Sequence, residues 1–308
     1  MNLAPVILFV YNRPLHTQKT VEALTLNPAH QNSDLYIICD AARNPNHTEA
    51  LKKTREYVKS IKGFRSIQII ENDINQGLAN NVIHNVSNLI QKHKRIIYLE
   101  DDTVPAPQFL DLMNQALDMY KSRPDIFSIS GYGPNITLPN HYKDSFYLHP
   151  RGCCWGFATW LNRWEKVDWS VKNGDTFTQD FREQQRLNIC GNDCADMLIS
   201  YLQHRIDSWA IRWCYAHVQN NAYCLIPKRS LISNIGNDNS GTHSTTSDKW
   251  DVTPLQTNES LILNPDIQPN LELIPSINRQ IFNYPIRWHI KSLLRRRLLS
   301  WYYQMTSR

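Results

Sequence analysis

The chain has 308 residues, of which 42% are hydrophobic and 20% charged, and its formal net charge at pH 7 is +5. This composition predicts a globular protein with a sizeable core, without low-complexity tracts or internal repeats. Seven basic and no acidic residues follow Glu272, so the excess positive charge is confined to the C-terminus. Because the rest of the chain is nearly neutral, we expect no broad nucleic-acid-binding face and no nucleic-acid partner.

Apolar runs alternate with helical periods through the first 130 residues. The first run, 5–11, predicts a buried strand. A signal peptide does not fit, because no basic n-region precedes the run and no small-residue cleavage site follows it. Further strands are predicted at 34–40, 66–71, 95–99 and 126–132, with helices at 15–26, 47–61, 75–93 and 106–121. Strands separated by such helices indicate βαβ units and a mostly parallel sheet, which is an α/β fold.

Polar side chains follow these strands, at the edge of the sheet where ligands of α/β proteins bind. The most acidic of these strand ends is Glu100-Asp101-Asp102, directly after the apolar run at 95–99. One interpretation is a solvated acidic turn, and the other is a site that binds a cation. Mg²⁺ or Mn²⁺ bound to a diphosphate needs only one or two protein carboxylates, so the second interpretation is chemically sound.

The segments "ILFVYNRP", "YIICDAAR", "NQGLA", "IIYLEDDTVPAPQFLDLM" and "SISGY" resemble the nucleotide-diphospho-sugar transferase (GT-A) fold. They are closest to bacterial family 2 sugar transferases of surface-polysaccharide pathways and similar to the N-acetylglucosaminyltransferase I type, whose metal motif is also Glu-Asp-Asp. The resemblance covers roughly residues 3 to 245. It implies a Rossmann-like, mostly parallel central sheet with flanking helices, and an inverting, metal-dependent glycosyltransferase.

The resemblance also implies roles for particular residues. Asp102 would ligate Mn²⁺ or Mg²⁺, and Asp101 would lie near the ribose or the sugar. For Asp40 the residue pattern leaves a second interpretation open, a plain helix cap or turn residue. The residues expected to bind the nucleotide-sugar, most simply a UDP-sugar, are Tyr11, Asn12, Arg13, Asp40, Gly77, Leu78, Glu100, Asp101 and His243.

Inversion requires a carboxylate that takes the proton from the acceptor hydroxyl. Asp193 is the first candidate and Asp196 the second, although Asp193 also fits a helix cap. The loop at 233–243, which ends at His243, is expected to fold over the donor, and an ordinary surface turn is the alternative.

The middle of the chain is dense in tryptophan. Trp160 and Trp164 stand four residues apart and could form one buried helical face, or some tryptophans could stack on sugar rings. Arg151 and Trp155 are the predicted acceptor-binding residues. The seven scattered cysteines predict free buried thiols in a reducing cytosol.

We therefore expect a catalytic domain over 1–250, with a nucleotide-sugar-binding half at 1–132 and an acceptor half at 133–250. A linker and extension at 251–285 would lead to a basic amphipathic helix at 286–308. The spacing of its apolar residues fits a helix on an anionic membrane surface or one packed on the protein itself. The first option predicts a cytoplasmic protein, peripheral on the inner face of the cytoplasmic membrane.

The predicted activity is transfer of a hexose or N-acetylhexosamine to a growing surface glycan, of capsule or lipopolysaccharide, on a glycan or lipid-linked acceptor. The alternatives are nucleotidyl transfer on the same fold and a non-catalytic glycan-binding protein. The first usually needs a Gly-rich loop after the first strand, and "YNRPLHT" has no glycine.

Overall fold

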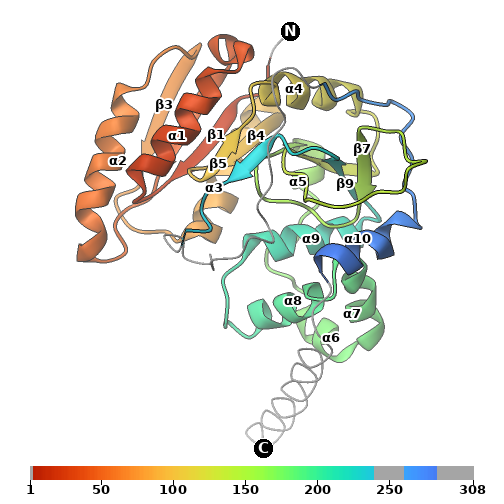
Figure 1. Ribbon diagram of the computed structural model, residues 1–308. Helices are drawn as coiled ribbons and strands as arrows, with labels where there is room; N and C mark the ends of the chain where they lie inside the picture. The colour runs from red at the N-terminus through yellow and green to blue at the C-terminus, as the bar shows by residue number, and fades with distance from the viewer. Residues whose placement is uncertain (1–2, 239–259, 283–308) are drawn as a thin grey trace, which may run out of the picture.

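The computed structural model describes residues 3–238 and 260–282. An eight-stranded sheet in the order β3-β2-β1-β4-β8-β6-β9-β7 forms its centre (Figure 1). The strands of this sheet are β1 (Val6–Val10), β2 (Asp34–Cys39), β3 (Ser66–Glu71), β4 (Arg95–Glu100), β6 (Ile126–Ser130), β7 (Phe146–His149), β8 (Phe157–Trp160) and β9 (Tyr223–Pro227). A separate two-stranded ribbon pairs β5 (Thr103–Pro105) with β10 (Ile232–Asn234).

The predicted α/β class and the mostly parallel sheet are confirmed. Strands β3, β2, β1 and β4 pair in parallel, as do β6 and β9, while β8 and β7 run against their neighbours. The carboxyl ends of β1, β4, β6 and β9 therefore share one edge of the sheet. The helices are α1 (Pro14–Thr25), α2 (Thr48–Ser60), α3 (Leu78–His93), α4 (Phe109–Met119), α5 (Leu161–Trp164), α6 (Gly174–Gln179), α7 (Phe181–Leu187), α8 (Cys194–Leu202), α9 (Trp209–Gln219) and α10 (Leu273–Ile281).

Alternate residues of the buried strands pack into two separate cores, one on each face of the sheet. Along β1, Val6 and Leu8 face the core that receives α1, α2 and α4, whereas Ile7 and Phe9 face the core that receives α3 and α9. The helices thus form the two outer layers of a three-layer domain (Figure 1). A third apolar cluster joins α6, α7, α8 and α9 below this sandwich.

The tryptophan pair differs from the prediction. Trp160 ends β8 and packs on the α4 side of the sheet, while Trp164 ends the short helix α5 and packs on the α3 side. Both side chains are buried, but the single helical face predicted from their spacing is wrong, because a strand end separates them. The predicted core role holds for both.

The segment 260–282 packs on the domain rather than running free. Helix α10 buries Ile274, Ile277 and Ile281 against the edge formed by β7 and β9. Within the described ranges, every helix is too short or too polar to span a bilayer. The predicted basic helix at 286–308 lies outside the described residues.

Candidate functional site

The acidic turn lies at the carboxyl end of β4. Glu100 is the last residue of that strand, and Asp101 and Asp102 form the turn before β5. Asp101 is 3% and Asp102 8% exposed, so the interpretation as a solvated turn is wrong. Burial and the charge of Asp102 raise the pKa of Glu100 to about 8. Burial also raises the pKa of Asp101 to about 6, although Arg13 opposes the shift. The turn therefore holds carboxyl groups that a cation would stabilise.

Arg13, which follows β1, is the cation that the structure places against this turn. Its Nε donates to Oδ2 of Asp101 at 3.3 Å, and its Nη2 contacts Oδ1 of Asp101 and lies 2.9 Å from Oδ2 of Asp102. The two carboxylates raise the pKa of Arg13 above its ordinary value in spite of the burial that opposes it. The Nη1 of Arg13 and the Oδ1 of Asp102 are buried without a hydrogen-bond partner. The ion pairs thus leave one donor and one acceptor open at the turn.

The residues present fit a divalent cation that a ligand helps to hold. No group of three His, Cys, Asp or Glu side chains able to form a complete metal site occurs in residues 3–238 and 260–282. Mg²⁺ and Mn²⁺ at a diphosphate do not need such a cage, because the phosphates and water supply most of the oxygen ligands. The unpartnered Oδ1 of Asp102 is the kind of hard oxygen ligand that such an ion takes.

The ribbon of β5 and β10 brings a second segment onto the turn. Asn234 is paired with Thr103, and the N–H of Ile235 donates to the carbonyl oxygen of Asp102 at 2.9 Å. Gly236 lies so close that a Cβ there would stand 2.1 Å from Oδ2 of Asp102. The described part of the predicted donor loop therefore lies against the acidic turn. His243, its predicted end, lies outside the described residues.

For the donor site predicted from the sequence, a Gly236→Ala substitution is expected to weaken Mn²⁺-dependent binding of a nucleotide-sugar by about tenfold or more. The added methyl group cannot share space with Oδ2 of Asp102, so the loop must retreat or the carboxylate must rotate. Titration of the variant with donor, with and without Mn²⁺, measures the effect. Ser233→Ala on β10 is the matched control, and equal affinities for the two variants would contradict the expectation.

Asp40, after β2, organises the loop between β3 and α3. Its carboxylate accepts hydrogen bonds from Asn72 and Asn75 at 3.0 Å and from the backbone N–H of Gln76 at 3.0 Å and Gly77 at 3.1 Å. Gly77 has a φ of +71°, which suits glycine, and precedes α3. The turn interpretation of Asp40 therefore describes its contacts, while its predicted role in nucleotide binding stays a prediction. Leu78, which opens α3, is 44% exposed.

Tyr11 links this region to the acidic turn. Its N–H donates to Oδ2 of Asp101 at 3.4 Å, and its hydroxyl contacts Nδ1 of His47 at 2.7 Å and accepts from the N–H of Arg43 at 2.7 Å. Asn12, between Tyr11 and Arg13, is partly exposed. The predicted donor-side residues from the first, second and fourth strand ends thus gather at one edge of the sheet.

Arg151 and Asp193 were predicted for different roles and form one ion pair. The Nη1 and Nη2 of Arg151 reach the two oxygens of Asp193 at 2.7 and 3.0 Å. Asp193 is 6% exposed and stands just before α8, whose first turn contains Asp196. The bidentate guanidinium of Arg151 stabilises the ionised carboxylate of Asp193 through two charge-assisted hydrogen bonds.

The charges of both this ion pair and the acidic turn act on the thiol of Cys154. Burial raises the pKa of the Cys154 thiol well above its ordinary value, the charge of Glu100 adds to the shift and that of Arg151 opposes it. Cys154 is thus within electrostatic range of both groups. Trp155 is partly buried and contacts Tyr132 edge-on, with ring centroids 4.8 Å apart.

The sequence interpretation missed three contacts that shape the site. The hydroxyl of Thr20 donates to the carbonyl oxygen of Asp101 at 2.8 Å, and His16 pairs with Asp238 at 3.1 Å. Both residues lie on α1, so this helix braces the turn and the loop from one side. The third contact is that of His47 with Tyr11. The only sequence feature that could have indicated a role for His47 is its position in the loop after the second strand.

No family model matches the chain, and no curated protein matches its sequence. Among solved structures, it is similar to a mannosyltransferase of Pyrobaculum calidifontis in complex with GDP-mannose and Mn²⁺. The TM-score is 0.37 and the identity 12%, over 71% of this chain and 73% of that one.

A nucleotide-diphospho-sugar transferase structure from Desulfovibrio desulfuricans gives a TM-score of 0.34 and 12% identity, over 56% of this chain and 71% of that one. TarS of S. aureus gives a TM-score of 0.36 and 9% identity, over 65% of this chain and 43% of that one. At such low scores and identities these likenesses do not show a family, and the function has to be inferred from the site itself.

Proposed function

We propose that this protein is a metal-dependent glycosyltransferase that uses a nucleotide-diphospho-sugar. The observation that supports this most strongly is the buried acidic turn at the end of β4, with an open carboxylate oxygen on Asp102 beside Arg13. A bound diphosphate would supply negative charge for the open nitrogen of Arg13, and its cation would supply positive charge for the open oxygen of Asp102. The turn also stands at the sheet edge where α/β proteins bind nucleotides.

Each residue of the turn has a distinct part in this proposal. Asp102 would hold Mn²⁺ or Mg²⁺ through its open oxygen, and the ion would neutralise the diphosphate as it leaves. Arg13 has an unpartnered Nη1 with which to donate to a phosphate oxygen while its other nitrogens keep Asp101 in place. Glu100 is bonded by the hydroxyl of Tyr98 at 2.6 Å and orients the turn from the sheet side.

For the acceptor, we propose inversion with Asp193 as the base and Asp196 as the alternative. Arg151 holds both oxygens of Asp193, so an acceptor that attracts the guanidinium would release the carboxylate for proton transfer. Arg151 would then contact the acceptor or the diphosphate. The segment that contains Ile235 and Gly236 packs against Asp102 and would keep water away from the bound donor.

The finer assignments are proposals from the sequence. A UDP-sugar donor, transfer of a hexose or N-acetylhexosamine, and an acceptor of capsule or lipopolysaccharide biosynthesis follow from the resemblance to family 2 transferases. Attachment to the inner face of the cytoplasmic membrane would depend on 286–308. A thermal-shift experiment tests the donor class directly.

The purified protein is expected to be stabilised against heat by one nucleotide-sugar, and only when Mn²⁺ or Mg²⁺ is present. Ligand at a hundred times its dissociation constant adds about 2.7 kcal/mol to the unfolding free energy, which shifts the melting temperature by several degrees. A screen of UDP-, GDP-, dTDP- and CMP-sugars with metal, with EDTA and with metal alone measures it. An equal rise in melting temperature with metal and with EDTA would refute the proposed site.

A further inference from the structure

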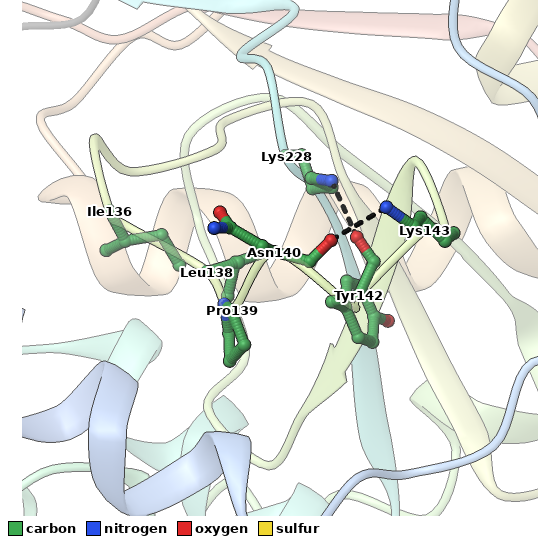
Figure 2. Close-up of a pocket in the computed structure, with 7 residues that line it drawn as sticks. All are labelled: Ile136, Leu138, Pro139, Asn140, Tyr142, Lys143 and Lys228. Carbon is green, nitrogen blue, oxygen red and sulfur yellow. Dashed lines mark hydrogen bonds between the residues drawn. The ribbon is translucent and has the colours of Figure 1, made fainter.

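A pocket lies at the same sheet edge, beyond β6 and β9 (Figure 2). Its volume is about 330 Å³, and its walls come from the loop after β6 and from the residue after β9. Ile136 and Leu138 give an apolar side, and Tyr142 gives an aromatic side. Two lysines, Lys143 and Lys228, also line it, together with Pro139 and Asn140. None of the residues assigned to the donor or to the base takes part.

The pocket is held in shape by backbone hydrogen bonds. The N–H of Lys228 donates to the carbonyl oxygen of Ser145 at 2.9 Å, and the hydroxyl of Tyr142 donates to that of Phe146 at 2.6 Å. The N–H of Tyr142 closes a turn onto Pro139 at 2.9 Å. These bonds fix the aromatic ring and the start of the Lys228 side chain relative to one another, so the pocket is preformed.

The two amines converge on neighbouring backbone oxygens, as Figure 2 shows. The Nζ of Lys143 donates to the carbonyl oxygen of Asn140 at 2.8 Å, and the Nζ of Lys228 to that of Tyr142 at 3.3 Å. In residues 3–238 and 260–282 no carboxylate forms an ion pair with either lysine, and Asp144 beside them accepts from Asn264 at 2.9 Å. An ammonium has three donors, so each lysine keeps donors for an anion.

The chemistry of the walls selects the ligand class. Two ammonium groups attract a carboxylate or a phosphate, and the Tyr142 face and the apolar side receive the ring of a sugar. The Nζ of Lys228 lies 5.7 Å from the centroid of the Tyr142 ring, so the charge and the aromatic face act on the same small space. A neutral sugar would leave the lysines unused.

The position relates this pocket to the acidic turn. Strand β9 is separated from β4 by β8 and β6, which amounts to about 14 Å across the sheet edge at the usual strand spacing. The segment that follows β9 runs from Lys228 at the pocket to Gly236 at Asp102. Eight residues of chain span at most about 28 Å. An oligosaccharide of a few sugars can therefore reach from one to the other.

We propose that this pocket binds an acidic sugar residue, bearing a carboxylate or a phosphate, of the acceptor glycan. The inference rests on the proposed glycosyltransferase function and adds the substrate class: an anionic glycan, held by Lys143, Lys228 and Tyr142 while its growing end lies at the acidic turn. The lysines set which acceptors bind, and the chemistry of transfer takes place elsewhere.

The test measures glycan binding in the absence of any donor. The probes are a glucuronate-containing oligosaccharide, the same oligosaccharide with its carboxyl groups reduced to alcohols, and glucose 6-phosphate as a phosphate-bearing sugar. The double variant Lys143→Gln, Lys228→Gln is expected to bind the acidic probes about tenfold more weakly, as fits two partly exposed charge contacts. The wild-type protein should bind the reduced oligosaccharide as weakly, and added salt should narrow the difference.

Lys92→Gln is the matched control, because Lys92 also lies over a tyrosine, 5.8 Å from the ring centroid of Tyr36, but lines no part of this pocket. Equal losses in the control and the double variant, or equal binding of the acidic and the reduced oligosaccharide, overturn the proposal. The donor-dependent thermal shift of the double variant is measured alongside. If the double variant keeps the donor-dependent thermal shift and binds the acidic glycan as tightly as wild type, this inference alone is overturned. If the wild-type protein shows no donor-dependent thermal shift, the proposed donor site is overturned.

Discussion

Replacing Asp102 with alanine is expected to lower the rate of sugar transfer by at least about 10³-fold, which corresponds to about 4 kcal/mol of transition-state stabilisation. The change removes the open oxygen through which the turn would hold the divalent ion. Folding should survive it, because Arg13 keeps its contacts with Asp101 and an unpartnered buried oxygen disappears. Transfer or donor-hydrolysis assays, with metal titrated in each, measure the loss.

Asp118→Asn is the control for this substitution. Asp118 is a carboxylate that pairs with Arg95 at the opposite end of β4, so it tests the loss of a charge near the same strand away from the site. It should transfer sugar at the wild-type rate. A fully active Asp102→Ala protein, with unchanged response to Mn²⁺, would remove the basis of the proposed function.

The second large effect concerns stability. Arg13→Ala should lower the unfolding free energy by about 3–5 kcal/mol near pH 8, because it leaves buried carboxylates without their cation. Asp101 already has its folded-state pKa raised to about 6, above that of an unfolded chain, and loss of Arg13 raises it further. Protons then bind the folded state more tightly than the unfolded one, so the lost stability returns as the pH falls toward 5.

Chemical denaturation at pH 5 and pH 8, with and without Mn²⁺, measures this expectation. Divalent metal should restore part of the stability at pH 8, since it replaces the missing positive charge. Arg65→Ala is the control, because Arg65 pairs with Asp34 at an exposed position and its loss should cost little at either pH. Equal and pH-independent losses in both variants would show that Arg13 acts through packing alone.

The first half of the fold could be predicted from the sequence because its signals are local. The runs at 34–40 and 66–71 became β2 and β3 within a residue. Buried parallel strands are continuous apolar runs, as β2 is, whereas β3 stands at the edge of the sheet and its residues are only partly buried or exposed. Strands β7, β8 and β10 are three or four residues long and pair with distant segments. Nothing in so short a stretch distinguishes a strand from a loop, and for the same reason the spacing of Trp160 and Trp164 also fits one helical face.

The residues that form the candidate site could be predicted from the sequence, but the contacts between them could not. Strand ends identify Arg13, Asp40 and the acidic turn, since parallel strands meet at one edge. The contact of Arg13 with Asp101 joins residues 88 apart in sequence, and it depends on β1 and β4 being neighbours. The bond between Arg151 and Asp193 likewise unites two predictions made separately.

The pairing of β5 with β10 affects the order in which the parts of the protein fold during synthesis. Strands β1 to β4 and the acidic turn are complete once about a third of the chain exists, but β10 arrives more than 125 residues later. A growing chain emerging from the ribosome would thus display its carboxylates well before Gly236 can cover them. The proposed substrate-binding surface is among the last parts to form, so a fragment truncated before β10 can keep most of the sheet yet lack a finished site.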